Sequence, residues 1–288
     1  MTSFELTNGQ RRYFGLNQIF DNWFRQSLSE TTTVYFEGDK IVKILDFSYG
    51  YLEYDTNINT TNKQILLPKT ARGKEQKLTV SKILKVKGSG IQFSASFLGG
   101  GISVYDNKRN LFFIKSFPEE GGISTYEDIK NWVRKYISES PSNYFEWLIK
   151  ELNSERKNNK IKQGDIIAFP VARYEYGFAS IVLNNFENEH VLLSGEIFKF
   201  NLFSKPLMIL PYSFTSRTLD INFDELVKKP TLKPIEISDT GVFYGEFPIV
   251  SFKKLDYAFL EEFDLASLSK YLTIPYTKTD LVEKNNRW

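Results

Sequence analysis

The sequence contains no cysteine and a single histidine among its 288 residues. Without cysteine, the chain has no disulfide bond, no thiolate metal site and no cysteine nucleophile. One histidine excludes a multi-histidine metal site within one chain, and a serine–histidine–acid triad would depend on His190 alone. No apolar run approaches the roughly 18 residues that span a bilayer. These absences predict no cofactor, no metal site and no contact with a membrane.

A secretory signal is also missing from the sequence, because charged residues interrupt the apolar ones throughout Met1–Leu16. We therefore expect a cytoplasmic location. Opposite charges are almost balanced: residues 1–155 hold 20 basic and 18 acidic side chains, and residues 156–288 hold 17 of each. Strong nonspecific binding of nucleic acid is not expected from net charge this small, so nucleic acid is an unlikely partner.

What the sequence has in abundance is aromatic residues, which make up 16% of the chain. With 41% hydrophobic residues overall, the composition is that of a globular protein. At about 150 residues per domain, the length predicts two domains. The polar stretch 154–162 lacks apolar periodicity and is the expected linker, so the predicted boundaries are 1–155 and 160–288.

The first predicted domain is β-rich and is closed by two helices. Runs of β-forming residues alternate with glycine and asparagine turns from Thr32 to Phe117, which predicts an antiparallel meander. Helices are predicted after Thr125, which is a good N-cap, and after Ser140, which precedes a proline. A further short helix is predicted near Gln18–Ser27.

The second predicted domain restarts with strands at Ile166–Val171, Tyr176–Leu183 and Val191–Phe200. Residues 212–241 are predicted to be irregular, and Leu255–Leu272 has roughly helical spacing of its apolar residues. The predicted fold class is therefore α+β, with two domains that each form a mainly antiparallel sheet with packed helices. The C-terminal sheet is expected to be strongly bent or barrel-like.

Catalytic residues are scarce in this sequence. His190 lies in a predicted turn next to Glu189, but no nucleophile elbow of the G-x-S-x-G type is present. An exposed turn histidine is the favoured interpretation, and we predict that the protein is not an enzyme. A hydrolase that uses His190 or a pair of carboxylates stays an alternative.

Clustered charge occurs in three places. Asp220, Asp224 and Glu225 form one acidic group, and Glu261 and Glu262 belong to another. Each is typical of surface solvation, although a basic protein partner would also fit them. The third group is basic and contains Lys69, Arg72, Lys74, Lys77, Lys82, Lys85 and Lys87.

This basic segment has two interpretations. With Phe93 and Phe97 nearby, it would suit a nucleic-acid-binding module, which is the alternative function. We favour a solvated loop followed by the polar face of a strand at Leu78–Val86.

A recognisable motif opens the second half of the chain. Gly164-Asp165 leads into an apolar strand that reaches Pro170, and Tyr176-Gly177 enters the next strand. This pattern resembles the Immunity protein 26 family of bacterial polymorphic-toxin systems over about residues 160–272. The same residues also have a structural explanation, because the glycine makes a turn and the proline ends a strand.

The resemblance implies an immunity protein that binds and neutralises a cognate toxin protein through a protein–protein interface. Interfaces of this kind use aromatic anchors and complementary charge. Aromatic residues in the segments predicted to be irregular are the ones free to serve as anchors. The predicted partner-binding residues are Tyr212, Phe214, Asp220, Phe223, Asp224, Glu225, Glu261, Glu262 and Tyr276.

Overall fold

The computed structural model describes residues 4–116, 122–155, 157–173, 175–184, 206–255, 270–271, 274 and 281–282. The chain divides into two compact units, Met1–Glu155 and Arg156–Trp288, and each is described here by itself. Whether each unit folds as an independent domain stays a prediction.

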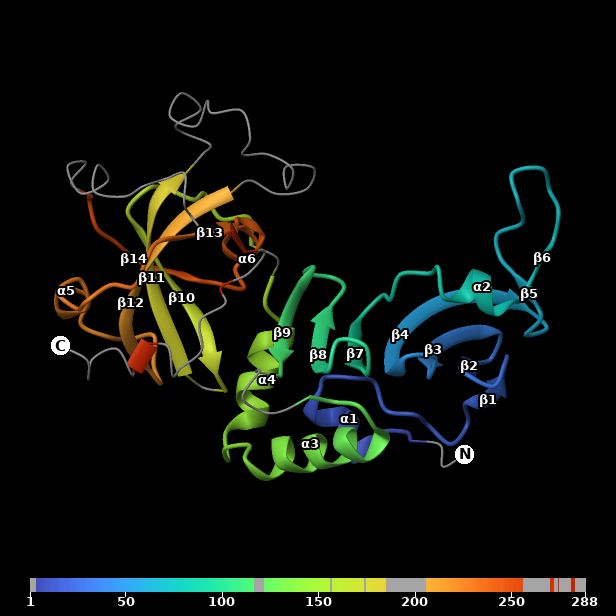
Figure 1. Cartoon of the computed structure of the whole chain (residues 1–288). Coiled ribbons are helices and arrows are strands. Elements are labelled where there is room, and N and C mark those ends of the chain that lie inside the picture. Colours follow the sequence, from blue (N-terminus) through green and yellow to red (C-terminus); the bar gives the residue numbers. More distant parts are fainter. Residues whose placement is uncertain are drawn as a thin grey trace. The chain divides into compact units, whose positions relative to one another are not determined.

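The first unit is built on a nine-stranded antiparallel sheet (Figure 1). Its main path runs in the order β1-β2-β3-β4-β7-β8-β9, while β5 pairs with the end of β4 and β6 pairs with β5. The strands are β1 (Phe24–Ser27), β2 (Thr32–Glu37), β3 (Lys40–Asp46), β4 (Gly50–Thr61), β5 (Ile65–Leu66), β6 (Gln76–Lys77), β7 (Ile91–Ser96), β8 (Gly101–Asp106) and β9 (Leu111–Lys115). This is the meander that alternation and turn residues predict.

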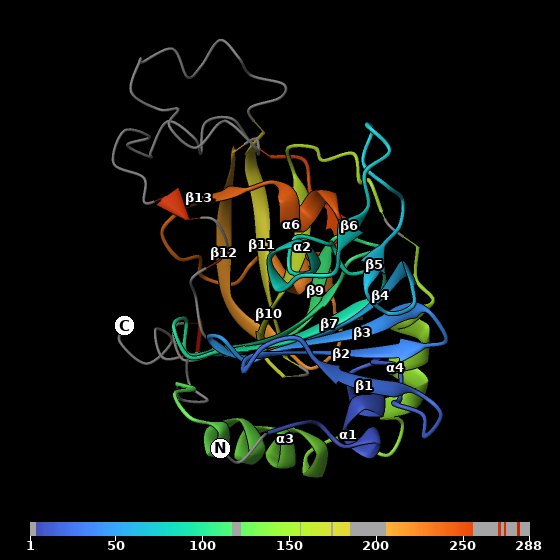
Figure 2. The same cartoon turned by 90° about the vertical axis from the view of Figure 1, so that its right-hand side faces the viewer.

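Helices cover both faces of this sheet. The helices are α1 (Asn8–Tyr13), α2 (Val80–Ile83), α3 (Tyr126–Ser138) and α4 (Tyr144–Leu152). Helices α1 and α3 lie on one side of the sheet and α2 on the other (Figures 1 and 2). Thr125 and Asp128 form the capping box that starts α3, as its sequence predicts. Helix α4 begins at Tyr144, three residues after Pro141, the residue that the sequence predicts as its first.

Two predictions for the first unit are wrong. No helix forms at Gln18–Ser27, because Phe24–Ser27 pairs with β2 as the edge strand β1. No strand forms at Leu78–Val86, because Val80–Ile83 is the helix α2. This helix buries Ile83 in a second apolar core of the first unit. In both places a contact with a distant part of the chain outweighs local apolar spacing.

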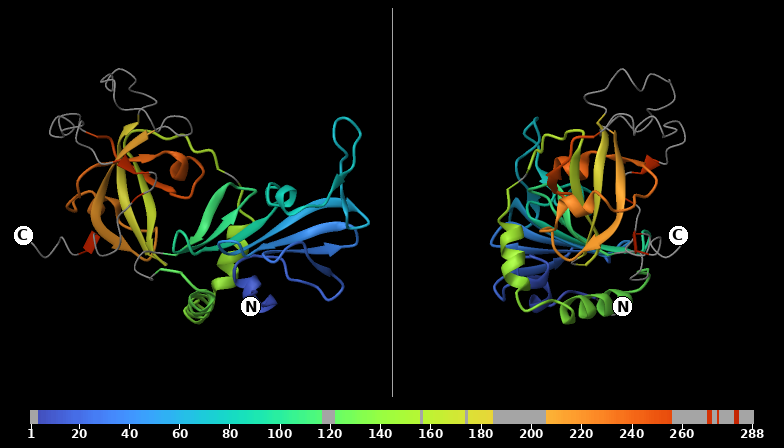
Figure 3. Two further views of the ribbon diagram at one scale, coloured as in Figure 1. Left: turned by 45° about the vertical axis from the view of Figure 1, so that its right-hand side comes forward. Right: turned by 90° about the vertical axis from the view of Figure 1, so that its left-hand side faces the viewer.

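The second unit contains a six-stranded sheet in the order β14-β10-β11-β12-β13-β15. Figure 3 shows the ribbon of this unit from two further directions. Its strands are β10 (Asp165–Ala172), β11 (Glu175–Asn184), β12 (Pro206–Ser216), β13 (Ile235–Ser238), β14 (Ile249–Phe252) and β15 (Lys270–Tyr271). All pairs are antiparallel except β13 with β15. The α+β class is confirmed, but over the described strands this sheet is not closed, so the barrel alternative is wrong.

The segment 212–241 is more regular than predicted. Strand β12 continues through Pro211 to Ser216, and the remainder forms α5 (Phe223–Leu226), β13 and the start of α6 (Thr240–Phe243). The predicted helix at Leu255–Leu272 is wrong at its end, where Lys270–Tyr271 is a strand. Residues 256–269, like the predicted strand Val191–Phe200, lie outside the described residues.

Candidate functional site

The sheet of the second unit carries an apolar cluster on each face. One cluster is the core of the unit, to which α6 contributes; it includes Ile167, Ile181 and Val242. The other, the outer cluster, has five buried members, Ile166, Ala168, Phe178, Tyr212 and Leu226. Seven further side chains of the outer cluster are only partly buried: Tyr176, Phe214, Leu219, Ile221, Phe223, Val227 and Val250. The outer cluster is therefore an apolar surface that protein covers only in part.

The Gly-Asp step of the family motif is a tight turn that starts β10. Gly164 has a φ of +92°, and a Cβ there would lie 2.4 Å from the carbonyl oxygen of Lys253. The Gly164 N–H donates to the Ile181 carbonyl at 2.8 Å. The buried Asp165 carboxylate accepts from the Lys162 N–H at 2.7 Å. These contacts give both residues a structural role in the turn.

The other motif residues also lie within the sheet. A Cβ on Gly177 would meet Leu281 Cδ1 at 2.6 Å and the Phe169 ring at 2.7 Å, so this position has no room for a side chain. Strand β10 continues through Pro170 to Ala172, so the prediction that this proline ends the strand is wrong. Exposed Pro170 pairs with Tyr176 beside a register shift, where a missing N–H is tolerated. The motif places its residues through backbone constraints.

Two of the predicted anchors, Phe214 and Phe223, are partly buried members of the outer cluster. The Phe214 ring lies 5.8 Å from that of Phe178, between centroids, and the Lys229 ammonium lies 5.9 Å from the Phe214 ring centroid. Tyr212 is only 4% exposed, and its hydroxyl lies 2.6 Å from Ser180 Oγ. Tyr212 is therefore a buried member of the outer cluster, and burial leaves little of it for the surface role predicted for it.

The predicted acidic residues Asp220, Asp224 and Glu225 are exposed in the segment that covers the outer cluster. The Asn222 side chain caps α5 by accepting from the N–H groups of Asp224 at 3.1 Å and Glu225 at 3.3 Å. Glu225 pairs with Lys228 at 2.7 Å, whereas Asp220 and Asp224 form no ion pair with a described residue. Glu261, Glu262, Tyr276 and His190 lie outside the described residues.

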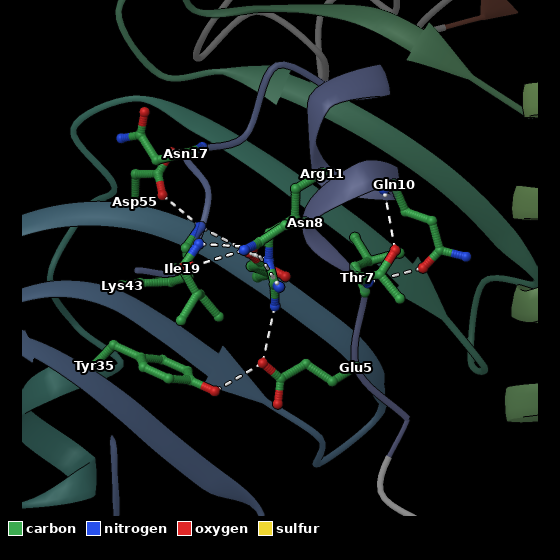
Figure 4. Close-up of polar contacts among 12 residues, drawn as sticks. Glu5, Thr7, Asn8, Gln10, Arg11, Asn17, Ile19, Tyr35, Lys43 and Asp55 are labelled. Atoms are coloured by element: carbon green, nitrogen blue, oxygen red, sulfur yellow. Dashed lines mark hydrogen bonds and ion pairs between the residues drawn. The ribbon is translucent and has the colours of Figure 1, made fainter. Parts of the chain in front are cut away.

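Sequence reasoning missed a buried ion network in the first unit, formed by Arg11, Lys43, Glu53 and Asp55 (Figure 4). The Lys43 ammonium lies 2.7 Å from Glu53 Oε1 and 2.6 Å from Asp55 Oδ1. Arg11 Nε donates to the same Glu53 oxygen at 2.7 Å. Lys43 and Glu53 are 0% exposed, so two cations and two carboxylates neutralise one another away from water.

The ion network fastens the N-terminal segment to the sheet. Arg11 reaches from α1 to β4, and its second arm donates to Glu5 at 2.9 Å. Glu5 in turn accepts from the Tyr35 hydroxyl at 2.8 Å, and the burial of that phenol raises its pKa to about 12. The signal for this site was strand alternation, which places Glu53 and Asp55 on one face of β4.

Burial alone would raise the pKa of Glu53, but the charges of Lys43 and Arg11 outweigh burial and lower it. The ionised Glu53 therefore stabilises the fold above its ordinary pKa of 4.5, and this contribution is lost as the pH falls through the lower folded pKa. For Asp55 burial outweighs the attraction of Lys43, so the pKa of this carboxyl is raised.

We predict that Glu53→Gln lowers the free energy of unfolding by about 3 kcal/mol near neutral pH, because the two cations lose a buried carboxylate. The difference from wild type should shrink below about pH 4.5, where Glu53 becomes protonated in the unfolded chain. Urea unfolding near neutral pH and again below about pH 4.5 measures this difference in unfolding free energy. The control is Glu146→Gln, which changes an exposed carboxylate. A difference that is independent of pH would contradict the assignment.

Neither a metal site nor a membrane span emerges from the described part of the chain. Within it, no three acidic, histidine or cysteine side chains are grouped as metal ligands. None of its helices is both long and apolar enough to cross a membrane.

Comparison with known protein families finds a match in the second unit. The model of the Immunity protein 26 family matches residues 162–271 of this chain. The match covers the whole β10–β11 motif and the segment that carries Phe223, and it confirms the resemblance seen in the sequence. It implies an immunity protein of a polymorphic-toxin system. No curated protein and no solved structure gives a significant match.

Proposed function

We propose that this protein neutralises a cognate toxin in the cytoplasm by binding it directly, without catalysis. The observation that carries the proposal is the family match over residues 162–271, which contain the partly covered outer cluster. The contact surface that we propose is the exposed side of this cluster, with Phe214 and Phe223 as anchors.

The surface has the anatomy that stable interfaces share. Such interfaces combine an apolar centre rich in aromatic residues with a polar rim. Here partly buried side chains form the centre, and the exposed acids Asp220 and Asp224 lie in the same covering segment. Because these two carboxylates have no cationic partner among the described residues, they are available to cations of a toxin.

The local fold holds the two anchors in place. Phe223 begins α5, whose N-terminus is capped by Asn222 and whose Leu226 is buried beneath it. Phe214 lies near the end of β12, and Tyr212 two residues earlier fixes that strand to Ser180 of β11. Anchors that are already ordered lose less conformational entropy on binding.

The test is coexpression of the protein with the toxin encoded next to its gene. We expect protection of the cells and a complex that copurifies. Phe223→Ser should raise the Kd at least about tenfold, since truncated aromatic hot spots typically cost 2 kcal/mol or more. The double change Asp220→Lys and Asp224→Lys should also lower the association rate at low salt.

The matched control is Tyr49→Ser, which removes an exposed aromatic side chain from the first unit. It should leave both protection and Kd unchanged. Absence of protection by the wild-type protein would overturn the proposed function. Protection that the Phe223 and acid variants retain in full would overturn the proposed surface.

A further inference from the structure

The segment Lys69–Lys87, named here the basic arm, is the most strongly charged part of the described surface. It leaves the sheet at β5, projects as a loop before β6, and ends after α2 (Figures 1 and 3). The loop is an ordered hairpin, because the Thr70 N–H donates to the Lys74 carbonyl at 2.9 Å. The Gln76 side chain closes its base by donating to the Pro68 carbonyl at 2.9 Å.

The charge of the first unit is segregated onto this arm. The arm holds seven cationic side chains and one acidic side chain, while the rest of residues 1–155 holds 13 cationic and 17 acidic ones. Glu75, the single acid, lies 3.7 Å from Lys69 in an exposed pair, which neutralises little. The near-zero net charge of the chain conceals this local concentration.

The cations extend from the tip of the arm to its base. Arg72 occupies the turn that Thr70 and Gly73 close, and the Gly73 N–H donates to the Thr70 carbonyl at 2.8 Å. At the base, Lys82 of α2 donates to the Lys77 carbonyl at 3.2 Å, which brings these two residues together. The loop at the tip of the arm and the helix α2 within the arm lie on the same side of the sheet, opposite α1 and α3 (Figure 1).

A surface of this kind fits a polyanion, and the aromatic residues decide which one. No aromatic residue occurs between Tyr54 and Phe93. The rings of Phe93 and Phe97 are not free to stack against bases, because Phe93 is 0% exposed and Phe97 packs against the same core. Proteins that hold single strands rely on stacking bases against aromatic rings, which the arm lacks.

Backbone phosphates need only cations. Duplex DNA carries one negative charge per about 1.7 Å of its axis, a density that suits several cations on one narrow projection. We propose that the basic arm binds the phosphate backbone of duplex nucleic acid, independently of sequence. This activity goes beyond toxin binding and involves a different unit of the chain.

The experiment uses the full-length protein and a fluorescent DNA duplex of about 20 base pairs, titrated between about 50 and 200 mM salt. The triple variant Lys69→Glu, Arg72→Glu and Lys74→Glu should weaken binding at least about tenfold at the lowest salt. It should also reduce the slope of log K against log salt by about three. The neutral set Lys69→Gln, Arg72→Gln and Lys74→Gln should reproduce the change in slope.

The matched control reverses three exposed cations on α3 and α4, Arg134, Lys135 and Lys150. It should change the affinity by less than about twofold. Affinity that is equal in wild type and the arm variants would overturn the proposal. Tighter binding of the corresponding single strand, or equal competition by polyglutamate, would overturn the choice of a duplex backbone.

This test is independent of toxin neutralisation. The arm variants should still protect cells from the toxin, because the proposed toxin surface lies in the other unit. For the wild-type protein, absence of protection together with salt-dependent DNA binding would count against the toxin proposal alone, and protection without DNA binding would count against the arm alone.

Discussion

Replacement of Lys43 by methionine is expected to lower the free energy of unfolding of the first unit by about 3–5 kcal/mol. Lys43 is 0% exposed, and its ammonium lies within 2.7 Å of both Glu53 and Asp55. The variant fills much of the space but leaves two buried carboxylates with one remaining cation, Arg11. A charge left without its partner away from water costs far more than the pair itself contributes.

Tryptophan emission isolates this effect, because Trp23, Trp132 and Trp147 lie in the first unit. The measurement is a urea titration in a Trp288→Phe background, so that every remaining indole reports on the unit that holds Lys43. The control is Lys130→Met, which breaks an exposed pair with Glu127 and should change the unfolding free energy by less than about 1 kcal/mol. Equal midpoints for the two variants would contradict a buried ion network.

Gly164→Ala should destabilise the second unit by about 3 kcal/mol, because it combines an unfavourable backbone angle with a clash. The φ of +92° disfavours any residue with a side chain, and the new Cβ would approach the Lys253 carbonyl oxygen to 2.4 Å. That carbonyl has little freedom to move away, because the Lys253 N–H donates to the Gly164 carbonyl at 2.9 Å.

Hydrogen exchange measures the destabilisation region by region. Peptides from β10 and β11 should exchange about 100-fold faster, whereas those from β2 to β4 should be unchanged. The control is Gly245→Ala in the same unit, where φ is also positive but the three atoms nearest to the new Cβ belong to the flexible Lys157 side chain. Weaker toxin binding with unchanged exchange would instead assign Gly164 to the interface.

Local patterns predicted the parts of the fold that local physics determines. The strands of the meander follow from β-forming runs between turn residues, and the start of α3 follows from the reciprocal bonds of Thr125 and Asp128. Local spacing predicts a helix at the edge strand β1, because it gives no weight to the ladder with β2, the partner that β1 has among the described strands. Whether a segment becomes an edge strand depends on its pairing with distant residues, and intrinsic strand propensity carries no information about that pairing.

The candidate surface was predictable only in part. Charge and aromatic content single out Phe214, Phe223 and the acids near them, and the structure places the two rings in the outer cluster and the acids exposed in the segment around Phe223. The same argument included Tyr212, which the structure buries because its segment continues β12 as a strand instead of forming a loop. Composition identifies side chains that can bind, whereas burial decides which are free to do so.

The two prolines of β12 have a consequence for the chain before it has folded. They flank the apolar run Leu207–Leu210, a segment that would otherwise be prone to self-association in an unfolded chain. Neither proline has an N–H to donate to a neighbouring ladder. In the folded sheet Pro211 is tolerated beside a register shift, and in a nascent or stressed chain the same residue acts as a gatekeeper against aggregation.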